Sequence, residues 1–183
     1  MKVVGLDPSE TAFGIGVIRQ EKQGCFQPDP SPFKCGAFTC KPGERRGHER
    51  LEFICRDVVG FCVGADLVVI EGAAYGKALR AFDMGGLFWV VTHKLWERKI
   101  KLAVIAPATL KVYLAGNGRA GKPEMLVAAR KRYGDLVRIE DHNQADAFGL
   151  AAMGAHSLGY ELREVPEKNA RVLYTTRALA GRV

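Results

Sequence analysis

One apolar run constrains the fold of this chain more than any other feature. It reads ADLVVIEG, residues 65–72, and its length suits a strand. A continuous apolar strand is typical of a central parallel strand covered on both faces. It lies between two segments with helical periodicity, at residues 44–62 and 79–98, and a second apolar run, KLAVIAP, follows them. This alternation predicts parallel strands joined by helical crossovers.

The amino-terminal segments add antiparallel strands. KVVGLD and AFGIGVIRQ flank a turn-like PSET, and FKCGAFTC supplies a third extended piece. Three more helices are expected after the last strand, in PATLKVYLAG, in a segment starting at Pro123, and in NQADAFGLAAMGAHSLG. We therefore predict the α/β class: a mixed five-stranded sheet with helices on both faces.

The chain length predicts one principal domain. With 183 residues, we expect a domain over 1–158 and a basic, irregular tail over 159–183. No apolar run approaches membrane-spanning length and the start does not resemble a signal peptide, so we expect a cytoplasmic protein that uses no membrane. The five cysteines then predict reduced thiols, and a zinc site at Cys25, Cys35, Cys40 and His48 is disfavoured because no CxxC pair occurs.

The charge favours a polyanionic partner. Lys and Arg number 27 against 20 Asp and Glu, which gives a net charge of +7 and a pI near 9.3. Nucleic acid is the leading candidate, ahead of an anionic membrane surface, although charge alone is a weak indicator.

Three acidic residues stand where a structural role is hard to assign. Asp7 ends the first expected strand, Glu71 ends the central strand, and Asp146 lies on a helix rich in small residues. If the two strands are neighbours, the three carboxylates meet at one end of the sheet. Their repulsion is relieved by protons or by divalent cations. Oxygen ligands favour Mg²⁺ or Mn²⁺, and a pair of such ions supports phosphodiester hydrolysis.

Each acid also has an ordinary explanation. Asp7 before Pro8 suits a turn, Glu71 before Gly72 suits a strand meeting solvent, and Asp146 suits a helix charge paired with an arginine. Their joint occurrence in this topology favours the functional interpretation.

Four blocks, in order and spacing, resemble the motifs of a known family. They are VVGLDPSETAFGIGVI, LVVIEGAAYG, GNGRAGK and NQADAFGLAAMG. Together, from residue 2 to about 156, they resemble the RuvC-type Holliday junction resolvases, which have a ribonuclease H-like fold. Compact proteins of this kind also occur in bacteriophages, and the chain is similar to those.

The resemblance implies an enzyme with a defined reaction. It implies a homodimer that cuts four-way DNA junctions by paired symmetric nicks, leaving 5′-phosphate and 3′-hydroxyl ends. Two Mg²⁺ ions per site, replaceable by Mn²⁺, would be held by Asp7, Glu71 and Asp146. The family's fourth ligand is Asp or His, whereas this chain has Asn143. Asn143 is also a candidate helix N-cap, and Asp141 and His142 are alternative ligands.

DNA-binding residues are implied beside the acids. The block GNGRAGK matches the family's glycine-rich segment, so Gly118, Arg119 and Lys122 are expected at the DNA backbone. After Glu71, the family's stacking aromatic has no match at Ala74, and Tyr75 is the substitute candidate, or else a core residue. We expect Lys77 and Arg80 along the same edge.

The helix expected over 79–98 is apolar around much of its circumference. Beside its first stripe it carries Phe88, Trp89 and Trp96. Such a helix is buried on two sides, either by its own core and a partner subunit or deep within a monomer. We expect the homodimer to form through this helix, by Trp89 and Trp96.

Three other functions remain compatible with these residues. An ATPase of the actin/hexokinase-like superfamily shares the fold but expects glycine-rich phosphate turns after the first aspartate. A non-catalytic junction-binding protein would explain Asn143. A nuclease with a broader preference for flaps and forks would use the same residues, because phosphate contacts do not reveal DNA shape.

Overall fold

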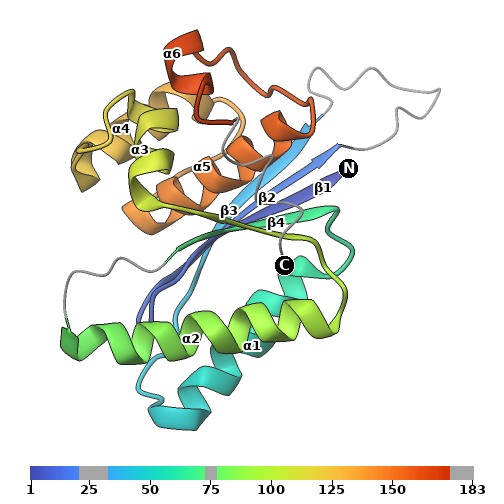
Figure 1. The fold of residues 1–183 in the computed structure, drawn as a ribbon, viewed down its shortest axis with the longest axis vertical. Helices are drawn as coiled ribbons and strands as arrows, with labels where there is room; N and C mark the ends of the chain where they lie inside the picture. Colours follow the sequence, from blue (N-terminus) through green and yellow to red (C-terminus); the bar gives the residue numbers. More distant parts are fainter. Residues whose placement is uncertain (21–32, 73–77, 174–183) are drawn as a thin grey trace.

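A five-stranded mixed sheet forms the centre of the molecule. The computed structural model describes residues 1–20, 33–72 and 78–173. The strands are β1 Lys2–Asp7, β2 Phe13–Gln20, β3 Phe33–Cys40, β4 Leu67–Glu71 and β5 Leu102–Ile105. Their order is β3-β2-β1-β4-β5, with β1, β2 and β3 antiparallel and β1, β4 and β5 parallel (Figure 1). The predicted mixed five-stranded sheet is confirmed.

Helices cover both faces of this sheet, as predicted. The helices α1 Gly47–Cys62 and α2 Ala78–Glu97 form the layer on one face. The opposite layer contains α3 Pro107–Ala115, α4 Lys122–Tyr133, α5 His142–Ser157 and α6 Glu167–Ala170 (Figure 1). Each layer has its own apolar core, and the sheet separates the two.

Helix α5 lies so close to the sheet that its backbone, as well as its side chains, contacts the strands. A Cβ atom added at Gly5 would stand 2.1 Å from the carbonyl oxygen of Ala147. One added at Gly14 would stand 2.3 Å from the carbonyl oxygen of Asn143. Side chains at these two strand positions would therefore push the helix away. The glycines of β1 and β2 and the small residues of α5 together permit the close approach.

Helix α2 contacts the sheet layer through one stripe of side chains only. Leu87, Val91 and Leu95 are fully buried. On its outer side, Trp89 is 70% exposed and Trp96 is 62% exposed. The alternative that α2 is a helix buried deep within a monomer is therefore wrong, because the sheet covers only one side of it.

The first part of the expected carboxy-terminal tail packs on the domain. Leu162 and Val165 are buried in the core beneath α5. Asn169 of α6 is 3% exposed, and its Nδ2 donates to the carbonyl oxygen of Tyr113 at the end of α3. The division at residue 158 remains a prediction, but residues 159–173 do not stand apart from the core. Residues 174–183 lie outside the described part.

The cysteines that the structure describes are free thiols. Cys40, Cys55 and Cys62 are buried, Cys35 is half-buried, and all four are free thiols. Burial raises the pKa of the Cys35 thiol to about 11 and that of Cys62 to about 12.

Across residues 1–20, 33–72 and 78–173, no helix is both long enough and apolar enough to span a bilayer.

Candidate metal centre

Two of the three predicted acids come together through strand pairing. β1 and β4 are parallel neighbours, with Leu6 opposite Ile70. Asp7 and Glu71 are the next residues on each strand, so both stand at the carboxyl end of the sheet. The two carboxyl groups lie close enough to shift each other's pKa, and Asp7 is only 7% exposed. The predicted adjacency of these strands is confirmed.

Helix α5 brings the third acid to the same place. Because Gly5 and Gly14 admit the helix backbone, the first turns of α5 lie over the end of β1 and the start of β2. Asp146 occupies the second turn, and its charge acts on both Asp7 and Glu71. The three carboxyl groups therefore form one electrostatic unit, built from two strands and one helix far apart in the sequence.

Burial and mutual repulsion make these groups hard to ionise. The pKa of Asp7 is raised well above its usual range, first by burial and then by the charges of Glu71 and Asp146. Burial, followed by the Asp146 charge, raises the pKa of Glu71 to about 7. Burial raises the pKa of Asp146 to about 6. Such a cluster is stabilised by any added positive charge.

Two lysines supply part of that charge. Lys122 lowers the pKa of all three acids, and Lys111 lowers those of Glu71 and Asp146. Lys122 was expected here, whereas Lys111 was missed. Its signal was available: α3 begins directly after β5, the parallel neighbour of β4, so a lysine in its second turn lies near the same sheet end.

The donor set suits a hard divalent cation. The Oδ1 atom of Asp146 is buried without a hydrogen-bond partner, which is costly unless another ligand meets it. Carboxylate oxygens are the ligands that Mg²⁺ and Mn²⁺ prefer. Within the part of the chain that the structure describes, no three acidic, histidine or cysteine side chains stand where they could hold a metal ion together. The three acids suit the ion by the chemistry of their oxygens, and their side chains would have to move together to hold it.

Asp141, one of the alternative metal ligands, caps the start of α5. Asp141 is the N-cap, and its Oδ1 accepts a hydrogen bond from the Gln144 backbone N–H at 2.9 Å. Its Oδ2 accepts from Thr39 Oγ1 at 3.3 Å. The alternative that Asn143 is the N-cap is wrong, since Asn143 lies in the first turn. His142 Nε2 stands 3.0 Å from Lys122 Nζ.

The glycine-rich segment forms the turn between α3 and α4. Gly116 ends α3 with a positive φ of 74°, a conformation that glycine adopts without strain. Arg119 is exposed, and its backbone N–H donates to Asn117 Oδ1 at 3.0 Å. Gly118 is half-buried, and Lys122 opens α4 one residue before Pro123, which was expected to be the first residue of that helix.

The side chains predicted to contact DNA just after Glu71 lie outside the described part of the structure. Tyr75 and Lys77 lie outside the described residues. Arg80 lies in α2, but its side chain is also outside the described part. Their predicted DNA contacts stay predictions.

Curated proteins similar to this chain share one name. A crossover junction endodeoxyribonuclease RuvC from Synechococcus sp. (strain RCC307) is 28% identical over 156 residues, covering 83% of this chain and 98% of that protein. The protein of the same name from Chlorobium phaeobacteroides is 25% identical over 169 residues, covering 91% of this chain and 87% of its own. No family model matches the chain.

Solved structures similar to this one include resolvases. Thermus thermophilus RuvC aligns with a TM-score of 0.64 at 23% identity, covering 91% of this chain and all of its own. Its complex with a Holliday junction aligns at 0.63 and 20% identity, covering 99% of this chain and 96% of its own. The fowlpox virus Holliday junction resolvase aligns with a TM-score of 0.57 at 10% identity, covering 86% of this chain and 99% of its own. The resemblance to RuvC-type resolvases is confirmed, as is the ribonuclease H-like fold.

Proposed function

We propose that this chain, a relative of the RuvC-type resolvases, is a metal-dependent endonuclease that resolves four-way DNA junctions. Paired symmetric nicks by phosphodiester hydrolysis would leave 5′-phosphate and 3′-hydroxyl ends. The observation that carries the proposal is the acid cluster, in which three carboxyl groups have raised pKa values and one of them, Asp146, has a buried Oδ1 without a hydrogen-bond partner. Natural selection of such a destabilising cluster requires a task that offsets its cost.

The acids would hold the ions on which the chemistry depends. Asp7, Glu71 and Asp146 are the proposed ligands, with the neutral side-chain oxygen of Asn143 as a weaker fourth. Two Mg²⁺ ions, when bound, supply charge for the attacking water and for the leaving oxygen. The same charge brings all three carboxyls into their ionised form near neutral pH, against the burial that otherwise protonates them.

The surrounding residues would position the DNA strand. Lys122 and Lys111 act on the acids from α4 and α3, and both ammonium groups can contact the oxygens of a phosphate placed there. The exposed Arg119 and the close backbone at Gly118 extend this edge. Together they form a basic border on an acidic centre, the arrangement needed to bring a polyanion to anionic ligands.

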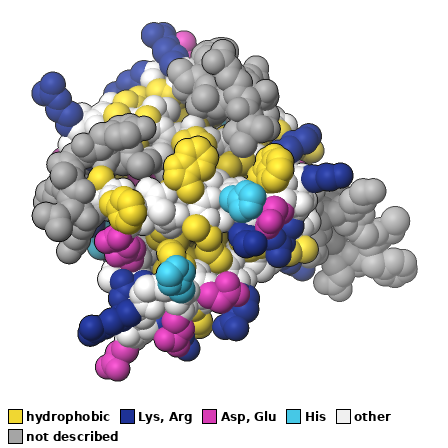
Figure 2. Space-filling view, turned by 60° about the horizontal axis from the view of Figure 1, so that its bottom comes forward, with side chains coloured by type: hydrophobic (Ala, Val, Ile, Leu, Met, Phe, Trp, Pro, Cys, Tyr) yellow, Lys and Arg dark blue, Asp and Glu magenta, His cyan; other side chains and the backbone are white. Residues whose placement is uncertain are grey.

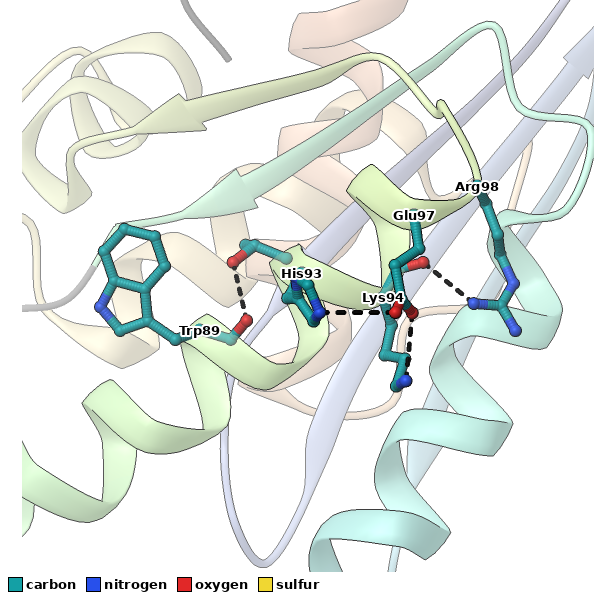
Figure 3. Close-up of polar contacts among 6 residues, drawn as sticks. Trp89, His93, Lys94, Glu97 and Arg98 are labelled. Carbon is teal, nitrogen blue, oxygen red and sulfur yellow. Dashed lines mark hydrogen bonds and ion pairs between the residues drawn. The ribbon is translucent and has the colours of Figure 1, made fainter.

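The outer side of α2 is the proposed dimer interface. Phe82, Trp89 and Trp96 recur every seven residues, and all three are exposed. Figure 2 looks onto this layer and shows hydrophobic side chains standing on its surface among charged groups. His93 Nε2 and Lys94 Nζ contact Glu97 at 3.4 and 3.0 Å beside them (Figure 3). A two-fold pair of such faces buries the aromatics within a polar rim, as in protein interfaces.

Metal dependence tests the proposal directly. The purified protein is incubated with a labelled four-way junction in Mg²⁺, in EDTA, and in Mg²⁺ after Glu71→Gln. Nicking in Mg²⁺ that disappears in the other two samples is expected. Junction binding without cleavage in either Mg²⁺ or Mn²⁺ would instead identify a non-catalytic junction-binding protein, and ATP hydrolysis without DNA would identify an ATPase.

Substrate preference needs a second assay. Initial nicking rates are compared on a four-way junction, a Y-fork and a duplex of matched sequence. The proposal expects the junction to be cut fastest and on two opposed strands. Equal rates on the fork and the junction would replace it with a broader branched-DNA endonuclease.

A further inference from the structure

A partly buried polar cluster ties the start of α5 to the edge strand β3. Its centre is Gln144, which is only 6% exposed. Its Nε2 donates to Thr39 Oγ1 at 3.3 Å, and its Oε1 accepts from the Glu140 backbone N–H at 2.8 Å. Thr39 Oγ1 in turn donates to Asp141 Oδ2 at 3.3 Å. We name these three side chains, Thr39, Asp141 and Gln144, the edge clamp.

The edge clamp does more than cap a helix. An ordinary N-cap needs only the bond from Asp141 to the Gln144 N–H. Here the Gln144 side chain turns back over the helix start and also reaches across to another element. Thr39 joins both partners, since its hydroxyl accepts from one and donates to the other. The first turn of α5 is therefore fixed in position relative to the sheet as well as terminated.

The clamp and the acids share one row of the sheet. Asp7 is opposite Gly14, and Gly14 is opposite Thr39. Helix α5 crosses this row, with Asn143 over Gly14 and Asp146 near Asp7. Gly14 lets the helix come close but makes no side-chain bond that holds it. The clamp supplies that bond at the outer end of the row.

We propose that Thr39 and Gln144 are positioning residues, which set the placement of Asp146 and Asn143 toward the divalent cation from the β3 edge of the sheet. This inference rests on the proposed function and deepens it. A hydrogen-bonded group outside the ligand shell commonly sets metal affinity because it restricts the ligand to one orientation. The clamp acts on the helix that carries the ligand rather than on the ligand itself.

A matched pair of variants at residue 39 tests the proposal. Thr39→Val keeps the shape but removes both hydrogen bonds, and Thr39→Ser keeps the hydroxyl. Mn²⁺ affinity of the free protein is measured by titration calorimetry, and the Mg²⁺ concentration for half-maximal nicking is measured on the junction. Thr39→Val should lower the Mn²⁺ affinity and raise the half-maximal Mg²⁺ concentration, each by about tenfold, with junction affinity unchanged. Thr39→Ser should restore both to within about twofold of the wild type.

A second variant separates positioning from folding. Gln144→Leu fills the same buried space but loses the bonds to Thr39 and Glu140, so it should weaken Mn²⁺ binding at least as much as Thr39→Val. If both variants lower the melting temperature yet bind Mn²⁺ like the wild type, the clamp is only structural and the inference is overturned. A wild-type protein that neither binds Mn²⁺ nor nicks the junction would overturn the proposed function and this inference together.

Discussion

The two faces of the sheet are covered in opposite ways. On one, α5 rests by its backbone on glycines, and eleven of its residues are buried. On the other, α2 rests on a stripe of side chains that includes Leu87 and Val91, and it leaves large aromatics such as Trp89 in solvent.

This difference separates two tasks. Direct backbone contact gives α5 little freedom to shift, because any movement meets the sheet within a fraction of an ångström. That rigidity suits a helix carrying a ligand. Contact by side chains leaves α2 with a second, apolar side that the monomer does not cover, which suits an interface.

Loss of Asp146 should abolish activity without harming the fold. Asp146→Asn keeps the shape but removes a ligand charge, so junction nicking in Mg²⁺ should fall by about 10³-fold or more. Because the change also relieves repulsion with Asp7 and Glu71, the melting temperature in EDTA should stay equal or rise. Near-normal nicking by this variant would show that α5 carries no essential ligand.

The glycine contact should be costly to disturb. Gly5→Ala places a Cβ 2.1 Å from the Ala147 oxygen, so the free energy of unfolding should fall by about 3 kcal/mol. Gly60→Ala is the control, since nothing lies within 4 Å of a Cβ at that position of α1. It should stabilise the protein by about 0.5–1 kcal/mol. Urea denaturation measures both, and equal effects would contradict the close contact of α5.

The exposed side of α2 should matter for association only. Trp89→Ala should weaken the proposed dimer by about 30-fold or more, as loss of a central aromatic commonly does. The control is Val127→Ala, which removes an exposed apolar side chain from α4, where Val127 is 65% exposed. Sedimentation equilibrium measures the dimer constants. A wild-type protein that is monomeric at micromolar concentration and still active would exclude this interface.

Stability without divalent cations should fall as the pH rises. The pKa of Glu71 is raised from 4.5 to about 7, and that of Asp146 from 3.8 to about 6. Between its unfolded and its folded pKa, each acid keeps a proton in the native state that it has lost in the unfolded state. Rising pH therefore favours unfolding. From about pH 4 to 7 in EDTA, the free energy of unfolding should fall by on the order of 1 kcal/mol or more, and the melting temperature by a few degrees.

Two additions make this pH dependence specific to the cluster. Glu71→Gln should flatten it, because the group that titrates is gone. Mg²⁺ at pH 7.5 should restore the lost stability of the wild type, since it favours the ionised carboxylates. A melting temperature that rises between pH 4 and 7 in EDTA would show that the acids do not repel one another as described.

Much of the fold was predictable because strand and helix periods are local properties. The apolar run ending at Glu71 predicted a central parallel strand, and β4 occupies that place between β1 and β5. The adjacency of Asp7 and Glu71 followed from topology, since neighbouring parallel strands end on the same side. The alternative that Asn143 caps α5 was wrong, because Asp141 and Asn143 are both good capping residues and only the path of the chain distinguishes them.

Residue periodicity and motif order were enough to predict the α/β sheet, the strand-end positions of Asp7 and Glu71, and the resemblance of four motifs to those of RuvC-type resolvases. Three features became visible only in the folded structure. They are the free side of α2, the place of Lys111 with Lys122 beside the acids, and the hydrogen bond between Thr39 and Gln144 across 105 residues. The physical reason is that periodicity reports which residues are apolar, whereas contacts between distant segments depend on how closely backbones approach. Here that approach is set by glycines, which carry no side-chain pattern of their own.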